Sequence, residues 1–202
     1  MKNLAAFVFP GFQTLDFFGP IEMLGDQSEE IKITLVAETL EPVSSVHGQR
    51  VLPDKTLAEC NDYDLLFIPG GDAALIVAEN KAVSDWLIET SANAELVMTV
   101  CTGSVLLATT GVLDGYKATT NKLDFIQTIP LGPKVDWVEK ARWVEDGKFF
   151  TSSGVSAGID MALAAIAHLY GRDVAKKTAF EAEYEWHEDS SWDPFASLVG
   201  LA

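Results

Sequence analysis

The sequence is poor in cysteine, histidine and basic residues, and it has no long apolar run. Its two cysteines, Cys60 and Cys101, form neither a disulfide framework nor the spacing of a metal site. No run of about eighteen apolar residues is present, so no membrane-spanning segment is expected. Pro10 and Gly11 interrupt the first apolar run, which argues against a signal peptide. These absences favour a cytoplasmic protein with free thiols and without a metal or other cofactor.

Basic residues are outnumbered by acidic ones. The chain has 14 Lys and Arg against 30 Asp and Glu, a net charge of -16. Nucleic acids and anionic membranes both attract basic surfaces, so neither is expected as a partner. We interpret the acidic surplus as a solubilising charge. Hydrophobic residues make up 48% of the chain and charged residues 22%, which is typical of a soluble globular protein.

Apolar runs of strand length alternate with segments of helix length. The predicted strands are residues 4–9, 31–37, 63–68, 96–100, 137–138, 142–144 and 148–151. The predicted helices are residues 16–24, 82–91, 103–110, 157–170 and 174–186. Such alternation indicates parallel strands joined by right-handed crossovers, and Asp146-Gly147 indicates a hairpin turn. The predicted fold is a doubly wound, mostly parallel α/β sheet sandwiched by helices, with one short antiparallel hairpin, in a single domain of residues 1–202.

Three loops follow predicted strands and carry the residues best suited to chemistry. They are residues 10–16, 69–72 and 101–104. Functional sites of open parallel sheets form at the carboxyl ends of the strands. We therefore expect these loops to meet at one edge of the sheet and to form the site there.

Cys101 is the predicted reactive centre. It stands between the strand 96–100 and a helix that begins at Gly103, which is the layout of a nucleophile elbow. The helix N-terminus is expected to lower the pKa of the thiol, and a thiolate is the form that attacks carbon. The alternative is an inert cysteine buried at a strand end. Cys60, which has acidic neighbours, is expected to be structural or merely exposed.

Asp16 and a pair of glycines are the other candidates for this site. Asp16 lies among apolar residues, so it is either a desolvated carboxyl of raised pKa that serves as a general acid, or a helix N-cap. Gly70 and Gly71 permit close approach of the backbone. The N–H groups of Gly71 and Thr102 can then bind developing negative charge, unless the glycines only form a loop.

The three histidines do not suggest a Cys-His pair. His47 lies in an expected turn, His168 on the polar face of a helix, and His187 among acidic residues. None follows Cys101 closely in the sequence. Each is interpreted as a residue outside the site.

Five stretches resemble the ThiJ/PfpI family, part of the class I glutamine amidotransferase-like superfamily that includes the parkinsonism-associated deglycase. They are FPGFQTLDFFGPIEML, DLLFIPGG, VCTGSVLLATTGVLDGYKATTN, SSGVSAGIDMALAAIAHLYG and EYEWHEDSSWDPF, and together they extend over nearly the whole chain. The resemblance implies a flavodoxin-like fold and a homodimer with the site near its interface.

Within this family the sequence is most similar to the isonitrile hydratase group, whose members hydrate an isonitrile to an N-substituted formamide without a cofactor. The similarity implies that Cys101 attacks the terminal carbon and that Asp16 performs acid-base steps. It also implies that Thr102 positions or stabilises the adduct before water hydrolyses the thioimidate. Many relatives have a histidine in an ATTH segment where this chain has Asn121, which cannot act as a base. This departure disfavours an amidase or a protease.

Two other functions remain open at this level. The first is a glyoxalase or deglycase that acts on methylglyoxal or its adducts, in which Glu22 competes with Asp16 for the acidic role. The second is a non-enzymatic protein that binds a small ligand or senses oxidants, with Cys101 oxidised to a sulfinic acid. In each case the partner is a small molecule, and for the enzymatic functions it is an electrophilic substrate. The residues considered as lining of its pocket are Phe12, Phe17, Phe18 and the residues near Trp137.

Overall fold

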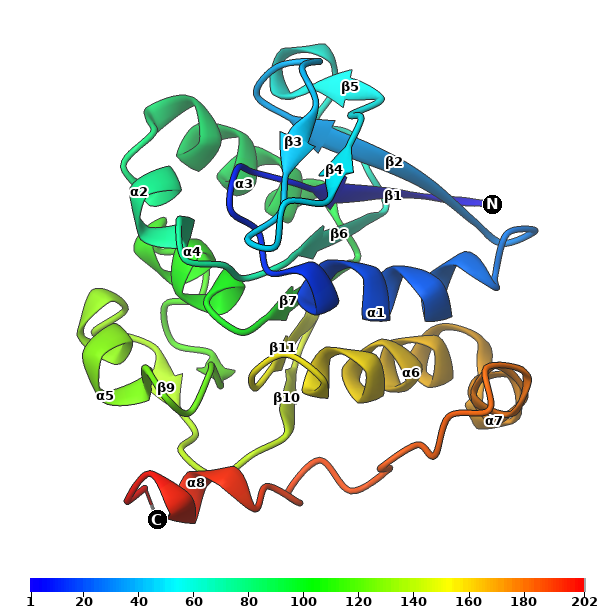
Figure 1. Cartoon of the computed structure of the whole chain (residues 1–202), viewed down its shortest axis with the longest axis vertical. Coiled ribbons are helices and arrows are strands. Elements are labelled where there is room, and N and C mark those ends of the chain that lie inside the picture. The colour runs from blue at the N-terminus through cyan, green and yellow to red at the C-terminus, as the bar shows by residue number, and fades with distance from the viewer. Residues whose placement is uncertain (202) are drawn as a thin grey trace.

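A seven-stranded sheet forms the centre of the molecule and helices flank it (Figure 1). The computed structural model describes residues 1–201. From one edge to the other the strands are β10 (Trp143–Asp146), β11 (Phe149–Ser152), β7 (Leu96–Val100), β6 (Leu65–Ile68), β1 (Lys2–Phe7), β2 (Ile31–Ala37) and β5 (Lys55–Thr56). All neighbours pair in parallel except β10 and β11, which form the predicted hairpin. The predicted doubly wound architecture is thereby confirmed.

The strand predictions hold best where the apolar run is continuous. Strands β2 and β7 have the predicted bounds. Strand β1 is shifted by two residues toward the N-terminus, and β6 begins two residues later than expected. The hairpin turns at Gly147, whose φ of 58° lies in the left-handed region that favours glycine.

Helices pack against both faces of the sheet. On one face α1 (Thr14–Gly25) and α6 (Ala157–Tyr170) lie side by side, and the Phe17 ring packs on Phe67 of β6. On the other face α3 (Lys81–Asn93) packs its Trp86 against Phe7 of β1. Helix α4 (Gly103–Thr109) follows β7 directly. The sheet thus has the buried apolar faces that its strand sequences predict.

Helix α7 (Arg172–Glu181) ends five residues before the predicted end at Trp186. The chain turns at Glu183, whose φ is 49°, and continues without regular structure along α6. There the Tyr184 hydroxyl and the indole N–H of Trp186 donate to Asp160 of α6. These contacts with a distant residue compete with continuation of the helix, and periodicity within the segment does not reveal them.

Short elements complete the fold, and only one of them, the strand predicted at residues 137–138, was expected from the sequence. They are β3 (Val43–Ser44), β4 (Arg50–Val51), η1 (Leu57–Glu59), α2 (Ala74–Ala78), β8 (Lys117–Ala118), α5 (Phe125–Thr128), η2 (Ile129–Leu131), β9 (Asp136–Trp137) and α8 (Phe195–Leu198). None is longer than five residues, so none contains enough residues to show a periodic pattern. Within residues 1–201, no helix is both long and apolar enough to cross a membrane.

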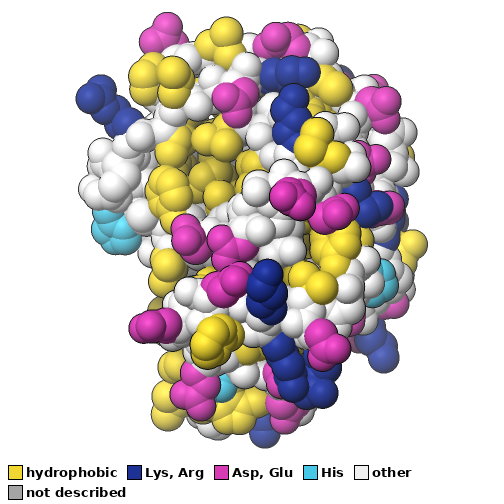
Figure 2. Space-filling view, turned by 90° about the vertical axis from the view of Figure 1, so that its right-hand side faces the viewer, with side chains coloured by type: hydrophobic (Ala, Val, Ile, Leu, Met, Phe, Trp, Pro, Cys, Tyr) yellow, Lys and Arg dark blue, Asp and Glu magenta, His cyan; other side chains and the backbone are white. Residues whose placement is uncertain are grey.

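Charged side chains are spread over the surface. The face turned to the viewer in Figure 2 shows acidic side chains scattered among lysines and arginines and separated by apolar ones. This view shows no broad basic area, in keeping with the net charge of -16.

Candidate active site

Cys101 lies on a strained turn between β7 and α4. Its φ of 55° is uncommon for a residue with a side chain, and the turn leaves the residue only 6% exposed. The hydroxyls of Ser104 and Thr120 both donate to its carbonyl at 2.9 Å. A Cβ on Gly103 would lie 2.5 Å from the carbonyl oxygen of Ile68, so only glycine fits there. The predicted strand-to-helix elbow is present, and hydrogen bonds to the Cys101 carbonyl hold it in place.

Asp16 is a fully buried carboxylic acid in the first turn of α1. The helix begins at Thr14 after the N-cap Gln13, so the N-cap alternative for Asp16 is wrong. Its Oδ2 accepts a hydrogen bond from the Gly70 N–H at 3.1 Å, and its Oδ1 has no partner among the described residues. Burial raises the pKa of Asp16 to about 7, against the opposing effect of hydrogen bonds with Gly70 and the Cys101 side chain.

Gly70 is the point around which the site is assembled. A Cβ there would lie 2.7 Å from the nitrogen of Thr102, 2.8 Å from Asp16 Oδ2 and 2.8 Å from Cys101 Cβ. The Gly70 carbonyl accepts from the Gln13 N–H at 2.8 Å. The loops that follow β1, β6 and β7 therefore meet, as the topology predicts.

The pKa of the Cys101 thiol is raised, so the expected lowering is wrong. Burial is the main cause, and the negative charge of Asp16 adds to it. Hydrogen bonds from the Thr102 N–H and the Asn121 side chain act in the opposite direction without reversing the shift. Desolvation therefore outweighs the helix N-terminus. Above about pH 7 the pair of Cys101 and Asp16 holds one proton in all.

Gly71 and Thr102 bind one another at the edge of the site. The Gly71 N–H donates to Thr102 Oγ1 at 3.0 Å, and that hydroxyl lies 3.2 Å from the Gly71 carbonyl oxygen. A Cβ on Gly71 would lie 2.3 Å from the Gly11 carbonyl oxygen, which explains the glycine. The Gly71 N–H expected to bind developing charge is occupied here, whereas the Thr102 N–H is directed to the Cys101 sulfur.

Several other residues considered from the sequence lie away from the thiol. Glu22 is exposed on α1, because two further turns of the helix carry it to the surface, and it does not line the cavity beside Cys101. Phe12 and Phe17 are buried in the core, and Phe18 and Trp137 also lie outside that cavity, so the expected aromatic lining is wrong.

The three histidines also lie outside the lining of that cavity. His47 Nδ1 is 2.8 Å from Thr14 Oγ1, His168 contacts the Phe150 ring, and His187 stacks on Trp192. Within residues 1–201, no group of three or more His, Cys, Asp or Glu side chains is placed to hold a metal ion.

A cavity of about 600 Å³ opens beside the thiol. Its lining consists of Gln13, Gly71, Asp72, Leu75, Cys101, Thr102, Asn121, Leu123, Asp124, Gln127, Thr128 and Val155. The side chain of Asn121 donates to Asp124 Oδ2 and accepts from the Leu123 N–H, both at 2.8 Å. The ATTN segment singled out Asn121 only as a missing histidine, whereas the structure places Asn121 in the lining of the same cavity as Cys101.

The fold and the elbow define a class of α/β protein that holds a cysteine at the carboxyl edge of a parallel sheet. Residues 2–168 match the model of the DJ-1/PfpI family, and the chain belongs to that family. It is 35% identical over 179 residues to an isonitrile hydratase from Pseudomonas putida, covering 88% of this chain and 76% of that protein.

Other relatives carry different names. The chain is 27% identical over 143 residues to the deglycase PfpI of Pyrococcus furiosus, covering 70% of this chain and 83% of that protein. Among solved structures, a ThiJ/PfpI family protein from Pseudomonas syringae superposes with a TM-score of 0.85 at 33% identity, covering 91% of this chain and 75% of that one. These likenesses establish the family and the flavodoxin-like fold.

Proposed function

We propose that this protein hydrates an isonitrile to an N-substituted formamide through a covalent adduct on Cys101. The observation that carries the proposal is the fully buried Asp16 carboxyl beside the elbow, since a Cβ on Gly70 would lie 2.8 Å from both Asp16 Oδ2 and Cys101 Cβ. Burial raises the pKa of this carboxyl to about 7. A thiol paired with a carboxyl suits a substrate whose carbon needs both a nucleophile and a proton. The similarity to an isonitrile hydratase supports the same reaction.

The first step adds the thiol across the terminal carbon of the isonitrile. The sulfur of Cys101 forms a bond to that carbon while Asp16 takes the thiol proton and delivers it to the same carbon. The product is a thioimidate, in which the carbon carries one hydrogen, a double bond to nitrogen and the bond to sulfur. No proton is gained or lost overall, because the proton of the thiol becomes the hydrogen on carbon.

The second step hydrolyses the thioimidate. Asp16, ionised again, removes a proton from water as the oxygen attacks the carbon, and it delivers that proton to the nitrogen. The carbon–sulfur bond then breaks, the sulfur takes the proton of the new hydroxyl group through Asp16, and the N-substituted formamide leaves. In this proposal the Thr102 N–H and the Asn121 side chain, which both act to lower the pKa of the Cys101 thiol, stabilise charge near the sulfur. Gly70 and Gly71 have no Cβ, which allows the backbone of their loop to lie against Thr102 and Gly11.

The proposal is tested by measuring N-cyclohexylformamide formed from cyclohexyl isocyanide. We expect turnover by the natural protein and a loss of at least about a thousandfold in Cys101→Ser, because the nucleophile is removed. Cys60→Ser is the matched control and should keep full activity, since Cys60 hydrogen-bonds Asp62 instead and lies outside the cavity. Undiminished turnover by Cys101→Ser contradicts the proposal.

A deglycase or glyoxalase is the second candidate, and the similarity to the deglycase PfpI is what favours it. The same thiol would then add to an aldehyde carbon of methylglyoxal or its adducts. Loss of methylglyoxal, measured beside isonitrile turnover at equal protein concentration, separates the two reactions. Absence of both, together with sulfinic acid on Cys101 after mild peroxide, favours the redox-sensing alternative.

The assembly and the cell compartment belong to the same proposal. We propose a single catalytic domain that forms a homodimer and works in the cytoplasm, where thiols stay reduced. The apolar side chains of Leu15 and Phe18 on α1 are 41% and 40% exposed, which suits an interface near the site. Sedimentation equilibrium tests the dimer, and a purely monomeric protein at micromolar concentration contradicts it.

A further inference from the structure

A second cavity, of about 350 Å³, lies next to the one beside Cys101. Its lining consists of Asn121, Lys122, Leu123, Ser153, Gly154, Val155, Ser156, Phe195, Leu198 and Val199. We call it the α8 cleft, because α8 and Val199 form one of its walls. Asn121, Leu123 and Val155 line both cavities, so the α8 cleft adjoins the cavity beside the thiol.

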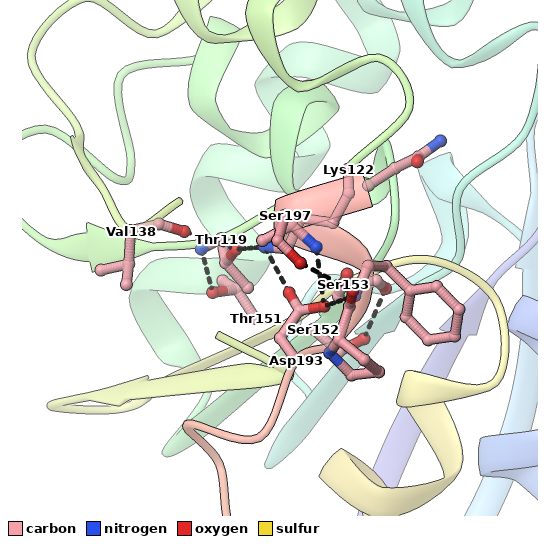
Figure 3. Close-up of polar contacts among 12 residues, drawn as sticks. Thr119, Lys122, Val138, Thr151, Ser152, Ser153, Asp193 and Ser197 are labelled. Carbon is pink, nitrogen blue, oxygen red and sulfur yellow. Dashed lines mark hydrogen bonds and ion pairs between the residues drawn. The ribbon is translucent and has the colours of Figure 1, made fainter. Parts of the chain in front are cut away.

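The α8 cleft is apolar although a lysine is part of its lining. Lys122 is 4% exposed, and its ammonium lies 3.3 Å from Asp193 Oδ2 and 2.6 Å from Thr119 Oγ1 (Figure 3). The ammonium also lies 5.3 Å from the centre of the Phe125 ring. Its charge is therefore neutralised within the protein, and the stem of the side chain is what the cleft can offer to a ligand.

Helix α8 is fixed in place as a wall of this cleft. Asp193 Oδ1 accepts hydrogen bonds from the N–H groups of Phe195 and Ala196, at 2.9 and 3.3 Å. Ala196 and Leu201 pack with Phe125 in a small separate core. Yet Phe195 and Leu198 leave 50% and 78% of their surface exposed. The helix is thus anchored on one side and presents large apolar side chains on the other.

The cavity beside Cys101 is less suitable for an apolar group. Asp72, Asp124, Gln13 and Gln127 all line it, and burying these polar groups against hydrocarbon costs free energy. In an isonitrile the substituent is bonded to the nitrogen and points away from the carbon that joins the sulfur, so a bulky substituent extends toward the space that adjoins the cavity beside the thiol. The α8 cleft adjoins that cavity, and the charged group of its lining, Lys122, is paired with Asp193.

We propose that the α8 cleft binds the apolar N-substituent of the substrate, and this inference rests on the proposed function. The substrate class is then an isonitrile with a bulky hydrocarbon substituent. Leu198 and Phe195 are specificity-determining residues that take no part in the chemical step. Since apolar contact is made equally before and during the reaction, its loss raises KM and leaves kcat nearly unchanged.

The test compares cyclohexyl isocyanide with methyl isocyanide in Leu198→Ser. We expect kcat/KM for the cyclohexyl compound to fall about five- to tenfold through KM, and that for the methyl compound to change less than about twofold. Leu52→Ser is the matched control, since Leu52 is 66% exposed and outside both cavities, and it should alter neither value. Leu75→Ser tests the polar cavity, and a larger selective loss there than in Leu198→Ser overturns the inference.

A binding measurement separates the inference from the proposed function. N-Cyclohexylformamide and N-methylformamide are titrated into Cys101→Ser and into the double variant with Leu198→Ser. Selective weakening of N-cyclohexylformamide binding in the double variant supports the cleft even if no isonitrile is turned over. Absence of turnover would then contradict only the proposed reaction. Turnover without dependence on Leu198 overturns the cleft alone. Equal losses for both substrates, with a smaller assembly in Leu198→Ser, show that a second copy covers the cleft and also overturn it.

Discussion

At the scale of single residues, the site depends on a carboxyl that the protein keeps away from water. Asp16 is fully buried, and only one of its oxygens has a hydrogen-bond partner among residues 1–201. Such a group is unfavourable for stability when ionised and useful as an acid or base near neutral pH. In this account Asp16 and Cys101 therefore share one proton and act as a pair.

Asp16→Asn should remove activity and increase stability at the same time. Turnover is expected to fall about a hundred- to ten-thousandfold, because no group then moves the proton. Since the pKa of Asp16 is raised in the folded state, its ionisation destabilises the fold as pH rises from about 4 to about 7. The variant lacks this effect, so its free energy of unfolding at pH 8 should be about 4 kcal/mol greater, with little difference at pH 4.

Urea denaturation at the two pH values measures this difference. Glu22→Gln is the control on the same helix, because Glu22 is exposed and should change neither activity nor stability. A destabilised Asp16→Asn at pH 8 would show that the carboxylate is favourably solvated, which contradicts its raised pKa.

The pH dependence of kcat/KM gives an independent test of the pair. The active form contains one proton, so the rate should rise about tenfold per pH unit below pH 7 and level off above it. The residual activity of Asp16→Asn should lose this inflection. A rate that is flat between pH 5 and 8, or that falls above pH 7, rules out Asp16 as the base.

At the scale of elements, the elbow requires that backbone segments approach one another without side chains between them. In Gly103→Ala the new Cβ would meet the carbonyl oxygens of Ile68 and Pro69 at 2.5 and 2.8 Å. Backbone atoms cannot move aside as a flexible side chain does, so the turn must shift. We expect activity to fall at least about tenfold through misplacement of Cys101.

Gly25→Ala provides the matched control for this substitution. Its Cβ would meet only Ile33 Cδ1, at 3.9 Å, so activity should stay unchanged. Turnover and the circular dichroism spectrum are measured for both variants. Full activity in Gly103→Ala means that the geometry of the elbow does not limit the reaction.

The same scale shows what the sequence can predict. Continuous apolar runs predicted β2 and β7 with correct bounds, and the order of strands and helices predicted that the loops at residues 10–16, 69–72 and 101–104 would meet. The prediction of a lowered pKa for the Cys101 thiol was wrong, because desolvation depends on packing that no local sequence pattern contains. Asn121 and Asp124 reach the site from a segment without periodic structure, so only the atypical ATTN motif gave a signal.

At the scale of the whole molecule, the C-terminal segment is held by buried charges. Asp160 of α6 accepts from Arg142 at 2.5 Å, from the Tyr184 hydroxyl at 3.1 Å and from the His187 N–H at 3.0 Å. Arg142 and Asp160 have side chains 6% and 0% exposed. The path of residues after α7 is thus set by contacts with partners 24 to 27 residues earlier in the chain, which sequence patterns do not reveal.

Arg142→Met should destabilise the protein by about 3–5 kcal/mol, because it leaves the buried Asp160 without its countercharge. Arg172→Met breaks an ion pair with Glu188 whose side chains are 64% and 36% exposed, and should cost less than about 1 kcal/mol. Chemical denaturation of both variants measures the contrast. Equal losses in the two variants would show that burial does not strengthen the first pair.

The central claim is that the isonitrile carbon becomes bonded to Cys101. Acid quenching of the protein during turnover of cyclohexyl isocyanide, followed by peptide mass spectrometry, tests this directly. The account predicts a mass increase of one substrate molecule on the peptide that contains Cys101, and none on the peptide that contains Cys60. Formamide production with an unmodified Cys101 throughout the reaction would contradict it.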